Sequence, residues 1–190
     1  MSSLYIGGTL EELIEKAFNP RRPIPEEEQL QRFHEILPWL VVKAREAAAE
    51  RATSWRNFHV GCALYAFKTV AYSAAERWRV FSGSNIKITK DSRPICAEQI
   101  AIGAAREAGY DRIIGMVIAG KPQPKEENSE QHLTLHPCKE CRRVFENLSE
   151  MSPDTLIITI LPEGDTYEVH TFEELLKIHG EGHQQNGSIT

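Results

Sequence analysis

The segment VGCALYAF at residues 60–67 is a short, continuous apolar run, and it decides the fold class. It shows no helical period, and an apolar run of this length is typical of a strand that is buried on both faces of a sheet. Two more apolar segments predict neighbouring strands, one from Trp78 to Phe81 that ends near Gly83 and one at 113–119. The chain of 190 residues is therefore predicted to fold around a mostly buried sheet.

Helical patterns alternate with these strands. The segment 96–108 predicts a helix that ends at Gly109, with an inward face made of Ile100, Ala101, Ala104 and Ala105. Shorter patterns predict a helix at 138–148, strands at 156–160 and 167–170, and a helix at 171–178 with Thr171 and Glu174 as a capping box. The alternation favours an α/β fold, in which a mixed sheet of about five strands lies between helices.

The N-terminal part of the chain predicts a helical extension. A capping box at Thr9 and Glu12 begins one helix, and the prolines at 20–25 cannot continue it. A second helix is predicted from Pro25 to about Arg51, and Pro38 either kinks it or divides it in two. Its predicted apolar face consists of Leu30, Phe33, Leu37, Leu40, Val41 and Ala44. We predict three parts: an N-terminal helical extension at 1–40, a main domain at 41–180 and a flexible tail at 181–190.

Composition excludes several classes of protein. Hydrophobic residues make up 41% and charged residues 26% of the chain, which excludes a wholly disordered or collagen-like protein. The formal net charge of -5 gives no overall basic field, so nucleic acid is not the expected partner. No apolar run is long enough to span a membrane, and the N-terminus lacks the pattern of a signal peptide. These features predict a cytoplasmic protein with no membrane partner.

Three of the four cysteines form a pattern that predicts a metal site. Cys96 begins one predicted helix in the motif Cys-Ala-Glu, and Cys138 and Cys141 begin another in the motif Pro-Cys-Lys-Glu-Cys. A Cys-x-x-Cys turn supplies two thiolates to one zinc ion, and a third thiolate leaves the fourth tetrahedral position for water. Glu98 is not needed as a ligand and is suited to move protons. The alternative is that the three cysteines are structural thiols and that Glu98 is an ordinary acidic residue at a helix N-terminus. The fourth cysteine, Cys62, is expected to be a small core residue.

These motifs resemble the zinc nucleobase deaminases, whose signature is Cys or His, x-Glu, then Pro-Cys-x-x-Cys. The chain is most similar to the small tetrameric, three-cysteine nucleoside branch of the cytidine deaminase superfamily. Phe58 to Leu64 resembles that branch's Phe-x-Val-Gly-Ala-Ala-Leu strand, and Gly83 to Ile86 resembles its Gly-x-Asn-Ile. The resemblance covers roughly residues 41–178, so the main domain is interpreted as a zinc-dependent deaminase domain.

The resemblance implies a hydrolase of nucleoside metabolism that acts on the C–N bond of a cyclic amidine. Cys96, Cys138 and Cys141 would bind Zn²⁺, and Glu98 would carry protons from the activated water to a ring nitrogen and to the departing ammonia. The implied substrate-binding residues are Phe58 against the base, Asn85 on the sugar, and Ala97 and Lys87 beside them. The implied assembly is a homotetramer, with a homodimer as the alternative, and the implied partner is a small-molecule substrate.

Three positions and one segment depart from the branch's pattern. Lys87 stands where that branch has a ribose-binding glutamate, Gln99 replaces an arginine that offsets thiolate charge, and His136 replaces a serine. No aromatic segment follows Ile178. We interpret Arg142 as the substitute for the missing charge compensation, and we assign no role to His132, His170 or His179.

A cytidine- or deoxycytidine-like nucleoside is the leading substrate. Because Lys87 departs from the branch's pattern, the alternative substrate is another amino-heterocycle or a nucleoside-like natural product. The alternative to an enzyme is a non-catalytic, zinc-stabilised interaction protein.

Overall fold

A five-stranded mixed sheet forms the centre of the computed structural model, which describes residues 27–72, 76–122 and 132–180. Its strand order is β3 (Trp78–Ser84), β2 (Val60–Phe67), β5 (Arg112–Gly120), β6 (Leu156–Ile160) and β7 (Tyr167–Thr171). The β5–β6 pair is parallel, and the other neighbours are antiparallel. The prediction of a mixed sheet of about five strands is confirmed.

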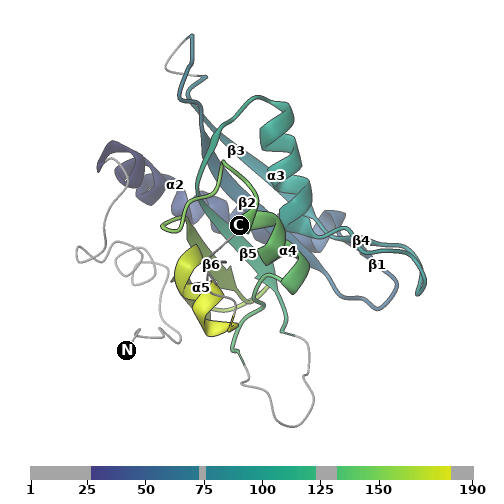
Figure 1. The fold of residues 1–190 in the computed structure, drawn as a ribbon. Coiled ribbons are helices and arrows are strands. Elements are labelled where there is room, and N and C mark those ends of the chain that lie inside the picture. The colour runs from purple at the N-terminus through teal and green to yellow at the C-terminus, as the bar shows by residue number, and fades with distance from the viewer. Residues whose placement is uncertain (1–26, 73–75, 123–131, 181–190) are drawn as a thin grey trace, which may run out of the picture.

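Helices cover both faces of this sheet. The helix α2 (Glu27–Glu46) lies on one face, and α3 (Ala97–Glu107), α4 (Lys139–Glu146) and α5 (Phe172–Ile178) lie on the other (Figure 1). Each face has its own hydrophobic cluster, so the fold has three layers. Alternate residues of β2 enter opposite clusters: Cys62 and Leu64 face α3, and Ala63 and Tyr65 face α2. The prediction that β2 is buried on both faces is confirmed, and Cys62 is a fully buried core residue.

The helix α2 follows the predicted apolar pattern. Phe33, Leu37, Leu40 and Ala44 are fully buried and Val41 nearly so, whereas the side chain of Leu30 is outside the described residues. The helix runs through Pro38 as one element and ends in a π-helical turn at Ala47–Arg51. The helix predicted at the capping box of Thr9 and Glu12 and the tail at 181–190 also fall outside the described residues.

The buried face of α3 differs from the prediction by about one residue. Ala97, Ala101, Ile102 and Ala105 are buried, whereas Ile100 is half-buried and Ala104 is exposed. The reason is a close approach at Gly83 in β3, where an added Cβ would lie 2.3 Å from the carbonyl oxygen of Ala97. The backbone of α3 therefore rests directly on β3, and this contact sets the rotation of the helix.

One short feature lies at the end of the sheet that carries the cysteines. A two-residue parallel pair, β1 (Thr53–Ser54) with β4 (Ile86–Lys87), was not predicted, because two residues show no periodicity. It joins the segment before β2 to the segment after β3.

At α5 the predicted capping box is confirmed. The Thr171 side chain accepts a hydrogen bond from the backbone N–H of Glu174, and the Glu174 side chain accepts one from the backbone N–H of Thr171. Among the described helices, none has the length and apolarity to cross a membrane.

Candidate active site

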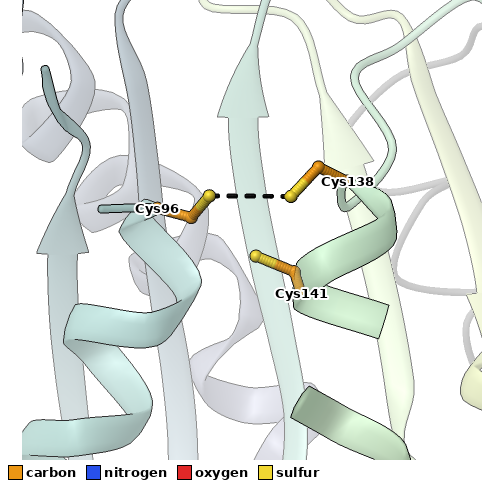
Figure 2. A group of neighbouring side chains, drawn as sticks. All are labelled: Cys96, Cys138 and Cys141. Carbon is orange, nitrogen blue, oxygen red and sulfur yellow. Dashed lines mark hydrogen bonds between the residues drawn. The ribbon is translucent and has the colours of Figure 1, made fainter. Parts of the chain in front are cut away.

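The three predicted ligand cysteines come together between the first turns of two helices. Cys96 is the N-cap residue of α3, Cys138 is the N-cap residue of α4, and Cys141 lies in the first turn of α4. Their sulfur atoms point toward one another (Figure 2) and all lie within 4.8 Å of one another, with 3.6 Å between the Sγ atoms of Cys96 and Cys138. Two thiolates on one tetrahedral Zn²⁺, each at about 2.3 Å, are about 3.8 Å apart. The spacing of the cluster therefore fits a zinc ion.

The thiols are too close together to ionise fully without a cation. Hydrogen bonds from Cys141 and Cys96 lower the pKa of Cys138 to about 2. The same hydrogen bond with Cys138 raises the pKa of Cys96 to about 12, and it also raises that of Cys141. Without a metal ion, the three cysteines therefore form one thiolate that accepts hydrogen bonds from two thiols. A divalent metal ion would deprotonate all three.

Glu98 lies in the first turn of α3 and is almost fully buried. Burial raises the pKa of its carboxyl to about 7, and the negative charge of Cys138 adds to this effect. A carboxyl group that titrates near neutral pH can both take and give a proton, as a general acid–base requires. The position of Glu98 is thus suited to the proton transfers that the sequence predicts for it.

A cavity of about 770 Å³ opens above the cluster. Its lining includes most of the predicted site: Phe58, Asn85, Lys87, Cys96, Ala97, Glu98, Cys138 and Arg142. Cys141 is buried beneath it. The structure thereby brings together side chains from β4, α3, α4 and the loop before β2. Gln99 does not line the cavity.

The side chain of Asn85 is bound to the loop that precedes β2. Its Oδ1 accepts a hydrogen bond from the backbone N–H of Val60 at 2.8 Å, and its Nδ2 donates to the carbonyl oxygen of Phe58 at 2.8 Å. Asn85 therefore positions Phe58 at the cavity. One N–H of its amide and one lone pair remain for a substrate.

Positive charge predominates along the cavity. Arg56, Lys87, Lys90 and Lys139 line it together with Arg142, whereas Glu98 is the single carboxylate among the described lining residues. Arg142 is buried, and its Nη1 donates to the carbonyl oxygen of Pro137 at 2.5 Å, next to Cys138. This excess of cations contrasts with the net negative charge of the chain.

A group of histidines on the same cavity was missed by the sequence analysis. His132, His136 and His179 line the cavity, and His136 also contacts the buried Glu168. Burial raises the pKa of Glu168, but hydrogen bonds from His136 and Thr134 outweigh it, and the pKa falls to about 2. His132 and His136 lie more than thirty positions before Glu168 and His179, and no motif marks the four residues as a group.

A family model matches this region of the chain. Residues 36–153 match the cytidine and deoxycytidylate deaminase zinc-binding region, which contains the three cysteines and Glu98. The chain belongs to this family. The resemblance inferred from the sequence motifs is thereby confirmed.

Solved structures of cytidine deaminases share the fold. The enzyme from Burkholderia pseudomallei is 26% identical, with a TM-score of 0.55 over 73% of this chain and 94% of that one. Two mutants of the Mycobacterium tuberculosis enzyme are 23% and 22% identical, with TM-scores of 0.50 and 0.51. Each match covers 74% of this chain, and 93% and 90% of the respective mutant. The chain therefore has a cytidine deaminase fold.

Proposed function

We propose that this family member is a zinc-dependent hydrolytic deaminase of an aminopyrimidine nucleoside, with cytidine or deoxycytidine as the leading substrate. The observation that carries the proposal is the juxtaposition of three cysteine sulfurs within 4.8 Å and a buried carboxylate at one cavity. Cys96, Cys138 and Cys141 would hold the zinc, which when bound makes a water molecule acidic enough to attack near neutral pH.

The residues of the chain carry the proton transfers. Glu98 takes a proton from the attacking water and delivers it to the ring nitrogen beside the amino-bearing carbon. It then takes the proton of the hydroxyl group now on that carbon and passes it to the amine, so that the C–N bond breaks, ammonia departs and a carbonyl remains. Burial keeps Glu98 away from bulk water, and its pKa of about 7 suits both directions of transfer.

The cavity wall would orient the substrate. Phe58, fixed by Asn85, presents an aromatic surface to the base, and the backbone at Ala97 lies between the zinc ligand and the general base. Arg142 compensates negative charge at the thiolates, aided by the N-termini of α3 and α4.

A second candidate is a related amino-heterocycle or nucleoside-like compound with an anionic or acceptor-rich group. Lys87 supports it, because a lysine can only donate where a ribose-binding residue needs to accept. The other cations on the cavity, Arg56 and Lys90, support the same direction.

The experiment is a panel of aminopyrimidines, nucleosides and nucleotides in an ammonia-release assay with product identification. We expect turnover of at least one aminopyrimidine with conversion of the amino group to a carbonyl. Preference for cytidine favours the first candidate, and preference for an anionic compound favours the second. No turnover of any member by a zinc-loaded protein would favour a non-catalytic, zinc-stabilised interaction protein.

A further inference from the structure

Four of the chain's seven histidines gather beside α5 and the loop that leads into α4. His132 and His136 lie on that loop, His170 lies in β7, and His179 follows α5. The ring centroid of His136 lies 3.9 Å from that of His132. It lies 5.3 Å from the ring centroid of His170 and also 5.3 Å from that of His179. None of these residues belongs to the cysteine cluster, and the proposed deamination uses none of them.

Glu168 holds the ring of His136 in place. The Nε2 atom of His136 lies 3.2 Å from Oε2 of Glu168, which is fully buried and also accepts from the backbone N–H of Thr134 at 2.9 Å. This contact uses the Nε2 atom of His136 and leaves Nδ1 on the other side of the ring, away from the carboxylate. A histidine that donates one N–H to a carboxylate and offers its other nitrogen is the arrangement found at metal ligands.

The other ring nitrogen of His136 faces a second imidazole. Its Nδ1 lies 3.1 Å from Nε2 of His179. Two imidazole nitrogens on one tetrahedral Zn²⁺, each at about 2.0–2.1 Å, are about 3.3 Å apart, with ring centroids about 5 Å apart. The centroid separations are 5.3 Å for His136 and His179 and 5.1 Å for His132 and His179, so both pairs match this pattern.

We propose that His132, His136 and His179 form a second metal site for a divalent transition ion such as Zn²⁺, with Glu168 orienting His136. Their ligand atoms lie within 4.8 Å of one another, and imidazole nitrogen suits Zn²⁺ and its neighbours in the transition series. His132 stacks on His136 at an interplanar angle of 20°, closer than two ligands of one ion lie. Coordination by all three residues therefore requires the half-buried His132 to rotate out of this stack.

The cavity gives the ion its route of entry. His132 and His179 are half-buried and line the cavity, so an ion reaches them from solvent. His136, Glu168 and His170 form a neighbouring candidate group, but all three are buried. A metal ion there would have to bind the Nε2 atom of His136, which already contacts Glu168. The site would place a second positive charge on the wall of the cavity that also holds the cysteine cluster.

The test is calorimetric titration of Zn²⁺ into the full-length protein after its tightly held zinc has been counted by elemental analysis. We expect one further equivalent per chain. The affinity of that equivalent should fall at least tenfold in His179→Ala and in His132→Ala, and about 10–100-fold in Glu168→Gln. His34→Ala is the matched control, since His34 is exposed on α2, and it should bind as the wild type does.

Co²⁺ distinguishes the second site from the cysteine cluster. The further equivalent of Co²⁺ should add the visible bands of a nitrogen-ligated ion without thiolate charge transfer. Absence of the further equivalent in the wild type overturns the proposal. So does an unchanged affinity in both His132→Ala and His179→Ala, or an equal loss in His34→Ala. The proposed deaminase function stands or falls separately, on ammonia release.

Discussion

Substitution of Gly83 by alanine should lower deaminase activity, although Gly83 does not line the cavity. Gly83 lies in β3, and an added Cβ would lie 2.3 Å from the carbonyl oxygen of Ala97 and 2.7 Å from the backbone nitrogen of Ala101. Both contacts are with the backbone of α3, so no side-chain rotation can relieve them. Ordinary van der Waals contact begins at about 3.4 Å, so α3 must move by about 1 Å.

That displacement reaches the chemistry, because the first turn of α3 carries Cys96 and Glu98. A shift of about 1 Å in a catalytic group can lower activity about 10²-fold. The overpacking itself should cost about 1–3 kcal/mol of the free energy of unfolding. We therefore expect Gly83→Ala to remain folded but to lose about two orders of magnitude in kcat/KM and to release zinc faster.

The control is Gly103→Ala on the same helix. No atom lies within 4 Å of a Cβ at Gly103, and alanine should stabilise an exposed helical position by up to about 1 kcal/mol. Urea denaturation gives the stability of both variants, and ammonia release with a chelator-competition assay gives activity and zinc retention. Wild-type activity and zinc retention in Gly83→Ala would refute the claim that this contact positions α3.

Three other substitutions test separate parts of the account. Arg142→Ala should raise the pH optimum of deamination and weaken zinc retention; an unchanged pH profile would argue against charge compensation by this residue. Lys87→Glu should increase kcat/KM for cytidine relative to anionic members of the substrate panel, and an unchanged ranking would remove Lys87 from substrate selection. Glu168→Gln should lose up to about 3 kcal/mol of stability at pH 7, since the pKa of this carboxyl falls from about 4.3 unfolded to about 2 folded. A carboxyl group whose pKa is lowered by folding stabilises the folded state only while it is ionised. The stability difference between wild type and variant should therefore shrink as the pH falls from about 4 toward 2 in urea titrations. A constant difference would contradict the ionised state of Glu168.

Much of the fold could be predicted from local sequence patterns. The doubly buried strand β2, the apolar face of α2 and the capping box of α5 each depend on residues that are close in the sequence. The rotation of α3 could not be predicted, because it depends on a contact with Gly83 in a different strand.

The same distinction divides the site. The cysteines and Glu98 stand in short motifs, so their grouping could be predicted, whereas the histidine group is assembled from a loop, β7 and the end of α5. Asn85 lies between these cases. Its motif predicted a place at the cavity, and only the structure shows that its amide holds the backbone of Phe58 and Val60.

The central claim is that Glu98 carries the protons of a zinc-dependent deamination. Glu98→Gln preserves the size of the side chain but cannot take a proton. Measured side by side with the wild type, the variant should keep its cysteine-bound zinc and its urea midpoint, and its rate of ammonia release should fall by at least about 10²–10⁴-fold. A zinc-loaded Glu98→Gln protein that releases ammonia within tenfold of the wild-type rate would contradict the account.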